Sequence, residues 1–331
     1  MKALVTGGAG FIGSHVVREL LEKNHDVVVL DDMSGGFADN VPDNVELVVG
    51  SITDNALVDR LFAAHQFEVV YHLAAYAAEG LSHFIKRFNY NNNLIGSVNL
   101  INASVNHGVR CFVFTSSIAV YGAGQLPMRE EDTPMPEDPY GIAKYAVEQE
   151  LACTKRMFGL DYVIFRPHNV YGEFQNIGDK YRNVIGIFMN QIMSGKPLTI
   201  FGDGEQTRAF SYIKDISGII ASAPENPKAF GQVFNIGADK AYTVNQLTHE
   251  VARVFGTTAE INYLEARKEV MHAYSSHEKV HKFFDVPPAT SLAEGIERMA
   301  AWAREHGPRQ SADFGEIEVA RNLPEGWLKK N

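Results

Sequence analysis

The sequence predicts an α/β fold in which a doubly wound, parallel sheet carries a smaller lobe of mixed α/β structure. Short apolar runs alternate with helical patterns up to about Gly172, and the first run leads into a glycine-rich turn. After Gly172, Gly and Pro interrupt shorter elements. The expected strands are Lys2–Thr6, Asp26–Leu30, Val45–Val49, Val69–Leu73, Cys111–Thr115 and Tyr162–Arg166, and the helices between them include Asn93–His107 and Tyr140–Phe158.

The domain division follows this change in pattern. We expect residues 1–172 to form the sheet domain and residues 173–331 most of the smaller lobe, with a return to the first domain near residues 205–225. Leu292–His306 is predicted to be an amphipathic helix, because its apolar residues recur at helical spacing. Residues 307–331 carry little signal.

Length, charge and cysteine content exclude several classes of protein. A chain of 331 residues can bury a sizeable core in one or two domains. Its formal charge of −10 at pH 7 and its pI near 5.6 argue against nucleic acid as a partner. The chain has two cysteines, no signal-peptide pattern and no apolar run long enough to cross a membrane. We therefore expect a cytoplasmic protein with no membrane partner.

The glycine-rich turn has the pattern of a dinucleotide site. Gly7, Gly10 and Gly13 follow an apolar strand and precede a helix, where they allow a tight turn, close approach of a pyrophosphate and close helix packing. The helix directs its free N–H groups and positive dipole end at the phosphates. A second apolar run ends in Asp31 and Asp32, about 20 residues further on, where a carboxylate binds a ribose hydroxyl.

The residues around Asp31 favour NAD over NADP. A carboxylate at this position accepts hydrogen bonds from the ribose 2′-hydroxyl and repels a 2′-phosphate. No Lys or Arg lies between Lys23 and Arg60 to offer that phosphate a cation. We therefore expect NAD as the cofactor.

Tyr140 and Lys144 open a predicted helix at a spacing that places them on one face. The strand before this helix runs into a hydroxyl cluster that includes Ser117. To take a proton at neutral pH, a tyrosine must lose roughly 3 units from its solution pKa of about 10, or about 4 kcal/mol. The Lys144 ammonium and a positive nicotinamide ring favour the phenolate, and Ser117 can hold the reacting hydroxyl. Ser117, Tyr140 and Lys144 are thus the predicted catalytic residues.

Together these motifs resemble the extended short-chain dehydrogenase/reductases of the nucleotide-sugar epimerase and dehydratase family, whose cofactor domain is a Rossmann sheet. The likeness runs from Met1 to about His306. The motifs that carry it are Thr6–Gly13, Asp31, His72–Ala75, Asn93–Gly96, Ser117, Tyr140 with Lys144, Arg166–Gly172 and Phe201–Arg208.

The resemblance implies which residues hold the two ligands. The NAD site is expected to comprise Gly7, Gly10, Phe11, Ile12, Gly13, Asp31, Asp32, Ser34, Ser51, Ile52, Leu73, Ala74, Ala75, Asn93, Thr115, Tyr140, Lys144, Pro167 and His168. A nucleotide-diphosphate sugar is expected to meet Ser117, Asn169, Asn183, Thr199, Phe201, Arg208 and Arg267. Phe201 would lie at the base and the two arginines at the diphosphate, where a bidentate guanidinium suits the oxygens.

The loop after Ser117 limits the predicted reaction to one carbon. Dehydratases of the family place an Asp-Glu pair there and decarboxylases a Glu, whereas this chain has Ile118 and Ala119. The resemblance therefore implies 4-epimerisation through a transient 4-keto sugar, in which the hydride that C4 gives to NAD returns to the opposite face. UDP-glucose and UDP-galactose are the default substrates, and UDP-glucuronate and N-acetylated UDP-sugars stay open.

Two alignments with the family are possible at the gate of the sugar pocket, and they place different residues there. In one register the small Ala273 replaces a bulky gate and makes room for an N-acetyl group. With a shift of one residue, the gate is Tyr274.

Family members commonly dimerise through two helices, which here would be about Phe88–His107 and Tyr140–Phe158, and we expect a homodimer. The apolar residues on these helices are Leu94, Val98, Ile101 and Val147, which could equally face the sheet.

Two other functions compete with this one. The string from His277 through Glu278 to His281 spells H-E-x-x-H, in which two imidazoles on one helical face bind zinc. No third ligand has a recognisable spacing and Pro287 ends the helix soon afterwards, so we expect an ordinary helix and no metal. The second alternative, a non-catalytic NAD-binding sensor, usually lacks the Tyr or the Lys that this chain keeps.

Overall fold

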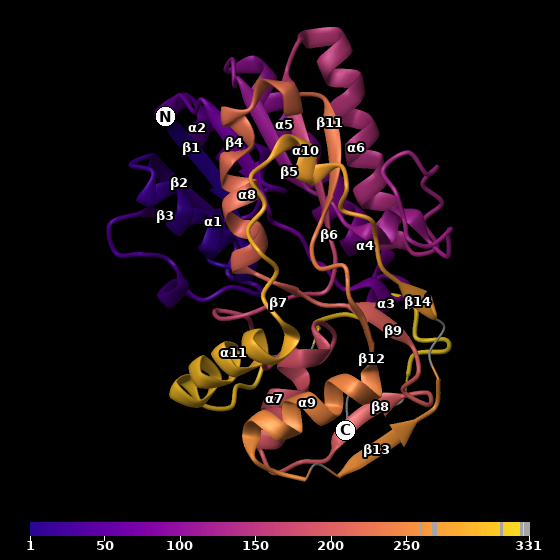
Figure 1. Cartoon of the computed structure of the whole chain (residues 1–331). Helices are drawn as coiled ribbons and strands as arrows, with labels where there is room; N and C mark the ends of the chain where they lie inside the picture. Colours follow the sequence, from indigo (N-terminus) through magenta and orange to yellow (C-terminus); the bar gives the residue numbers. More distant parts are fainter. Residues whose placement is uncertain (259, 267–269, 312–313, 325–326, 328–331) are drawn as a thin grey trace.

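The computed structural model describes residues 1–258, 260–266, 270–311, 314–324 and 327 (Figure 1). At its centre lies a seven-stranded parallel sheet with the order β11-β6-β5-β4-β1-β2-β3. The strands are β1 (Lys2–Thr6), β2 (Asp26–Asp31), β3 (Glu46–Val49), β4 (Val69–His72), β5 (Cys111–Thr115), β6 (Asp161–Pro167) and β11 (Gln232–Ile236). Every predicted strand is present, and each end lies within one residue of its expected position.

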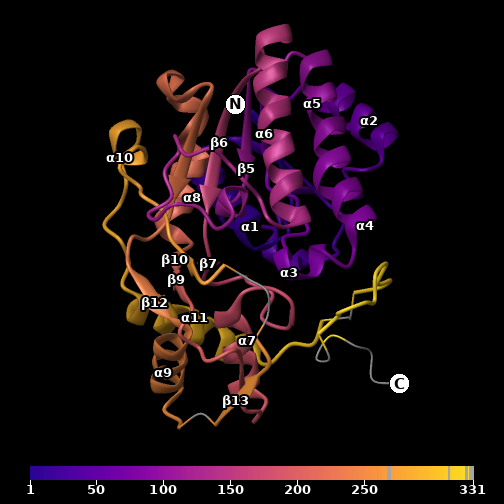
Figure 2. The same ribbon diagram turned by 90° about the vertical axis from the view of Figure 1, so that its right-hand side faces the viewer.

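Helices cover both faces of the sheet, which gives the predicted doubly wound arrangement (Figure 2). One face packs on α1 (Phe11–Glu22) and α8 (Lys214–Ser222), and the other on α2 (Asn55–His65), α5 (Gly96–Asn106) and α6 (Pro139–Phe158). Because successive strand side chains point to opposite faces, Val5 and Val29 join the first core while Leu4 and Val28 join the second. Burial on both faces explains why these strands are continuous apolar runs.

A second lobe lies beyond the carboxyl ends of the strands (Figure 1). Its helices are α7 (Val184–Met193), α9 (Val244–Phe255) and α11 (Leu292–His306). Its strand pairs are β8 (Leu198–Phe201) with β13 (Ile261–Leu264), and β9 (Thr207–Ala209) with both β12 (Ala241–Thr243) and β14 (His272–Ala273). The α11 helix has the predicted bounds because the Ser291 hydroxyl caps its first turn and Gly307 ends it.

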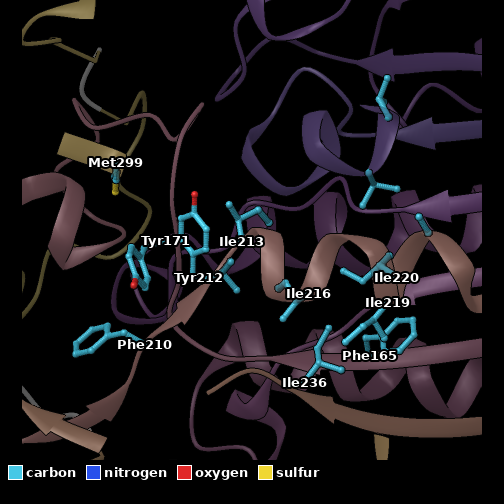
Figure 3. Close-up of a cluster of buried hydrophobic side chains, with 14 of the residues drawn as sticks. Phe165, Tyr171, Phe210, Tyr212, Ile213, Ile216, Ile219, Ile220, Ile236 and Met299 are labelled. Atoms are coloured by element: carbon cyan, nitrogen blue, oxygen red, sulfur yellow. The ribbon is translucent and has the colours of Figure 1, made fainter. Parts of the chain in front are cut away.

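The chain returns from the second lobe to the sheet domain after β9. The short strands β7 (Val170–Tyr171) and β10 (Ser211–Tyr212) pair side by side, and from there the chain enters α8, which packs on α1. In Figure 3, Ile216, Ile219 and Ile220 of α8 lie beside Phe165 of β6 and Ile236 of β11. The return segment therefore continues to the end of β11, a strand that the sequence did not predict. The division at residue 172 remains a prediction.

Short helices form the edge of the sheet domain nearest the second lobe. They are α3 (Glu79–Ser82), α4 (Lys86–Tyr90) and a π-helical turn, Asn91–Ile95, which leads into α5. The remaining short helix, α10 (Val280–Phe283), follows β14. The side chains of Ile101 and Val147 are buried in the core against the sheet. They therefore do not belong to an exposed helix face through which a dimer could form. Among the described residues, no helix combines the length and apolar character needed to cross a membrane.

Candidate active site

A cleft of about 2030 Å³ lies between the carboxyl ends of the strands and the second lobe. It extends from the point where β1 lies between β2 and β4, which is the topological switch point of the sheet. Open α/β sheets bind ligands at this point because the neighbouring connections diverge to opposite faces and leave a crevice. The glycine turn, Asp31, Ser117 and Tyr140 all line this one cleft.

The glycine turn has no room for side chains. A Cβ on Gly13 would lie 2.1 Å from the carbonyl oxygen of Gly7, and a Cβ on Gly7, whose φ is +72°, would lie 2.7 Å from the backbone nitrogen of Ala74. Gly10 precedes α1 without a side-chain cap, and Phe11, Ile12 and Gly13 of the first turn line the cleft. A bare helix N-terminus that faces a cleft is a site for phosphate, so this turn fits the pyrophosphate of NAD.

Asp31 ends β2 at the wall of the same cleft and is 7% exposed. Its carboxylate accepts the N–H groups of Ala9, at 3.0 Å, and of Met33, at 2.9 Å. Burial raises the pKa of Asp31, which these backbone hydrogen bonds oppose. Each carboxylate oxygen keeps a lone pair, so the side chain is held in place and can still accept from a ribose hydroxyl.

The cation that the sequence search missed comes from another segment. Arg182 lies so close to the loop after β2 that a Cβ on Gly35 would be 3.2 Å from its Nη2 atom. Its guanidinium is bound by the carboxylate of Asp179, with Nε to Oδ2 at 2.7 Å. The expectation that no cation lies near this loop was therefore wrong, although Asp179 pairs with Arg182, and the Asp31 carboxylate alone carries the structural preference for NAD.

Ser117, Tyr140 and Lys144 converge at the ends of β5 and α6. Asp138 caps α6 through the N–H of Gly141, at 2.9 Å, and so fixes the helix turn that carries Tyr140. The Nζ atom of Lys144 lies 5.8 Å from the centre of the Tyr140 ring and donates to the carbonyl oxygen of Thr115 at 2.8 Å. Ser117 lies close enough to the Tyr140 hydroxyl to lower its pKa. The three predicted catalytic side chains thus form one buried group.

The electrostatics of this group oppose ionisation of Tyr140. Burial raises the pKa of Tyr140 well above 10, the Glu79 and Asp138 carboxylates raise it further, and the Ser117 hydroxyl lowers it. Burial lowers the pKa of Lys144 to about 7, and the Glu148 carboxylate limits the fall. Tyr140 therefore stays a phenol until additional positive charge reaches the site.

A buried ion pair supports the catalytic face of α6. Glu148, one helical turn beyond Lys144, is 3% exposed and accepts from Arg166 Nε at 2.9 Å and Nη2 at 2.5 Å. Its Oε1 atom also accepts from the Ser116 hydroxyl at 2.5 Å. These bonds join α6 to β5 and β6, so the helix that carries Tyr140 is fixed to the sheet.

Glu79 is a charged residue of the cleft that sequence reasoning missed. It begins α3 and lines the cleft, and its charge raises the pKa of Tyr140 more than any other charge does. The predicted catalytic residues did not include Glu79. No motif marks Glu79, and its one sequence signal is that it follows the end of β4 by a few residues.

Most residues predicted for the NAD site do line the cleft, but Ser51 and Asn93 are not among its lining residues. The Ser51 hydroxyl bonds Thr53 at 2.8 Å. The Asn93 side chain is buried behind the wall, where its Oδ1 accepts the N–H of Tyr76 at 2.8 Å and its Nδ2 donates to the Tyr76 carbonyl at 3.1 Å. Asn93 thus fixes the loop after β4 rather than forming the cleft surface.

The residues predicted to meet the nucleotide-sugar lie on the opposite wall. Asn169, Asn183, Thr199, Phe201 and Arg208 all line the cleft. The guanidinium of Arg208 donates to backbone carbonyls at residues 207, 270 and 271, which fixes its position. Arg267, the second predicted arginine, lies outside the described residues.

The two candidate gate residues line different cavities. Ala273 is buried and lines the main cleft. Tyr274 instead lines a separate pocket of about 400 Å³, together with Arg129 and His281. The cleft therefore has a methyl group where the other register would have placed an aromatic ring.

The H-E-x-x-H string does not form a helical zinc site. The α10 helix begins at Val280, so His277 precedes it while His281 lies within it. His277 is buried between Asp239, at 2.6 Å from its Nδ1 atom, and His168, at 3.1 Å from its Nε2 atom. Among the described residues, no group of three His, Cys, Asp or Glu side chains could hold a metal ion.

His168 has a structural role consistent with its place beside Pro167 in the cleft wall. Burial, together with the neighbouring His277, lowers its pKa to about 3, so the ring is neutral. Its Nδ1 atom lies 2.9 Å from the carbonyl oxygen of Ala209, to which it donates. This bond ties the end of β6 to β9 of the second lobe.

The fold and the cleft define an α/β protein with a nucleotide-type crevice, in which a serine, a tyrosine and a lysine form one buried group. Residues 3–237 match the model of the NAD-dependent epimerase/dehydratase family. The chain belongs to that family, and its cofactor is NAD.

Individual relatives agree with this assignment. A putative UDP-glucose 4-epimerase of Methanocaldococcus jannaschii is 35% identical, over 91% of this chain and 98% of its own. The crystal structure of UDP-glucose 4-epimerase from Thermotoga maritima with UDP-glucose is 36% identical, with a TM-score of 0.89, over 92% of this chain and 99% of its own. The Thermus thermophilus UDP-glucose 4-epimerase, in complex with NAD, is 30% identical with a TM-score of 0.85, over 92% of this chain and 99% of its own.

The relatives do not all share one substrate. The matches also include a protein named UDP-glucuronate 4-epimerase, at 30% identity, and one named UDP-N-acetyl-α-D-glucosaminuronate decarboxylase, also at 30%. Family membership therefore establishes an NAD-dependent enzyme of the epimerase/dehydratase family, and its substrate has to be argued from the cleft.

Proposed function

We propose that this chain is a 4-epimerase of UDP-hexoses, of the UDP-glucose/UDP-galactose type. The observation that carries the proposal is the buried group of Ser117, Tyr140 and Lys144 at the cleft, followed by Ile118 and Ala119, which can neither donate nor accept a proton through their side chains. This set suits reversible oxidation at one carbon and lacks the additional acid in that loop that elimination requires.

Each residue has a distinct role in that reaction. The bare turn at Gly7–Gly13 and Asp31 would hold NAD, which supplies the acceptor and donor of hydride for C4 of the sugar. Tyr140 removes the proton of the C4 hydroxyl and later returns it. Ser117 holds that hydroxyl in position for the proton transfer to Tyr140. Lys144 favours the phenolate as a neighbouring cation. Arg208 anchors the diphosphate, which leaves the sugar free to turn.

The wall at Ala273 supports a wider range of sugars than glucose and galactose. A methyl group there leaves space for a substituent at C2, so UDP-N-acetylhexosamines are the second candidate substrates. We expect Ala273→Tyr to reduce turnover of N-acetylated sugars at least about tenfold while it leaves UDP-galactose within about twofold, because the clash arises only with the larger sugar.

A panel of UDP-, GDP- and dTDP-sugars tests the proposal. Purified enzyme is incubated with each sugar without added reductant, and the products are identified by NMR. Interconversion of C4 epimers supports the proposal. Products that have lost water or carbon dioxide would reject it in favour of a dehydratase or decarboxylase, and Glu79 would then be the first residue to vary.

We also propose that the enzyme is a homodimer, paired along α4, the π-helical turn and α6. Phe88, Ile95 and Ile142 are 37%, 49% and 42% exposed on these elements. Apolar side chains that share a surface favour burial against a second copy. Sedimentation of the wild type and of Ile95→Glu tests this, since the charged variant should be monomeric and an unchanged dimer would rule out this surface.

A further inference from the structure

The segment that follows α11 crosses from the second lobe to the sheet domain. We call residues 307–327 the strap and describe it from residues 307–311, 314–324 and 327. Figure 2 shows this yellow segment leaving the second lobe and rising on the side of α3 and α4. The relatives match almost their whole lengths, and the share of this chain that they leave unmatched is about as long as the segment after α11.

The first attachment of the strap is to the second lobe. Asn190 of α7 forms two hydrogen bonds with the backbone of Arg309, at 3.0 Å to its carbonyl and 2.9 Å from its N–H. The Ser311 hydroxyl donates to Asn176 at 3.0 Å. The strap therefore leaves α11 in a defined direction.

The second attachment is to α4 and the residues before it. The Glu318 carboxylate accepts the N–H groups of Arg87, at 2.8 Å, and Phe88, at 2.9 Å. The carbonyl of Phe84 accepts the N–H groups of Glu318, at 2.9 Å, and Val319, at 3.1 Å. Charge-assisted bonds of this kind are the stronger class of hydrogen bond, so Glu318 is the main polar anchor of the strap.

Aromatic packing completes the attachment. Trp327 is 5% exposed and packs with Ala78, Leu81 and Ile85, and its ring centre lies 5.3 Å from that of Tyr181. The contacts of Trp327 thus join the loop after β4 to the loop before α7.

The strap covers the end of the cleft where the chemistry takes place. Glu79 and Arg182 are both close enough to Tyr140 to affect its pKa. Trp327 shares one buried apolar cluster with Ala78, the neighbour of Glu79, and its ring packs on Tyr181, the neighbour of Arg182. Arg321, Asn322 and Leu323 of the strap line the cleft itself.

We propose that the strap is the outer wall of the sugar subsite, where it retains the oxidised 4-keto sugar while the sugar turns and lifts to exchange substrate for product. This inference rests on the proposed epimerase function. Oxidation moves a hydride from C4 to NAD and a proton from the hydroxyl to Tyr140. If the 4-keto sugar escapes before the hydride returns, the cofactor is left reduced, so escape can be counted directly.

The first experiment tests whether the strap contacts the bound sugar, and it does not require turnover. Hydrogen exchange at the Glu318 and Val319 amides is followed with UDP and with UDP-glucose as probes. We expect exchange to be about fivefold slower with UDP-glucose than with UDP, because only the hexose reaches the wall. Equal protection by the two probes would overturn the proposal.

The second experiment measures escape of the keto sugar. Glu318→Gln weakens the anchor, and Glu316→Gln, an exposed substitution of the same type on the same segment, is the matched control. With UDP-galactose, we expect Glu318→Gln and Trp327→Ala each to raise the reduced cofactor left per turnover about tenfold, as the loss of a charge-assisted bond or a buried ring implies. The control should match the wild type. An unchanged ratio in both strap variants would contradict the role in retention.

The two proposals fail in different ways. If the wild type interconverts no UDP-sugar but the strap amides still respond to the hexose, the epimerase function is wrong. The proposal that the strap lines the sugar subsite is then retained. If the wild type epimerises but neither the hydrogen exchange nor the escape ratio responds as expected, the proposal for the strap is wrong. The epimerase function is then retained.

Discussion

Replacement of Glu148 by glutamine tests how the sheet supports the catalytic helix. The substitution keeps the shape of the side chain but removes its charge. In the wild type the carboxylate accepts three hydrogen bonds, from Ser116 and from two nitrogens of Arg166. In the variant an NH₂ group must face one of these donors. The Arg166 side chain, which is 4% exposed, then keeps its charge without a counterion.

The expected loss of stability is large. Removal of one partner from a buried ion pair costs about 3–5 kcal/mol, because the remaining charge cannot be rehydrated. Many folded proteins have a total free energy of unfolding of only about 5–15 kcal/mol. The same change removes the carboxylate that raises the pKa of Lys144, so this pKa should fall below its value of about 7. The alkaline limb of the pH-rate profile should then move to lower pH.

Urea unfolding of the wild type and three variants measures the effect. Glu150→Gln, an exposed substitution on the same helix, is the control and should stay within about 0.5 kcal/mol of the wild type. Replacement of both partners, as Glu148→Leu with Arg166→Met, should recover most of the loss, because no buried charge remains. A loss below about 1 kcal/mol in Glu148→Gln, or a double variant as unstable as the single one, would refute this reasoning.

Three further predictions concern the residues around the cofactor. Tyr140→Phe should lower turnover about 10³-fold with NAD content unchanged, as measured in denatured enzyme, and retained turnover would remove Tyr140 as the base. Asp31→Ala should weaken NAD binding about tenfold in titrations, and unchanged affinity would show that Asp31 does not bind the ribose. Burial lowers the pKa of Lys144 from 10.5 to about 7, so the unfolded chain binds more protons between these values. Wild-type stability should therefore rise by up to about 1.4 kcal/mol per pH unit from about pH 7 to pH 10 relative to Lys144→Met, and parallel curves for the two proteins would contradict this.

The inner strands could be predicted from sequence because each is an apolar run buried on both faces and ended by glycine or polar residues, and the edge strand β3 because its run is also apolar, although it is only partly buried. The missed strand, β11, has polar side chains at Gln232 and Asn235. Asn235 is buried because its amide accepts from the Tyr121 hydroxyl at 2.8 Å and donates to the Met128 carbonyl at 3.2 Å. These partners come from a distant loop, so no local pattern could identify the strand.

The site was predictable where a motif encodes it and not elsewhere. The glycine turn and the Tyr140–Lys144 pair have fixed spacings, since one turn or one helix face carries each of them. Glu79 reaches the cleft through the path of the chain after β4, and Trp327 reaches it through contacts with residues more than 140 positions away in sequence. Such placements depend on tertiary packing alone, which is why residues 307–331 carried little signal.

The two ends of the sugar subsite are built in opposite ways, and each suits its task. Tyr140, Lys144 and Glu148 follow one stripe of α6, and the buried Glu148–Arg166 pair fixes that stripe to the sheet. Positions of reacting groups affect rate steeply, so this end has to be rigid. The opposite wall rests on Glu318 and Trp327, which are attached by a few hydrogen bonds and one aromatic cluster. A wall attached in this way can open at a cost of only a few kcal/mol, whereas release of α6 would expose a buried charge. Substrate exchange should therefore open the strap and leave the catalytic helix in place.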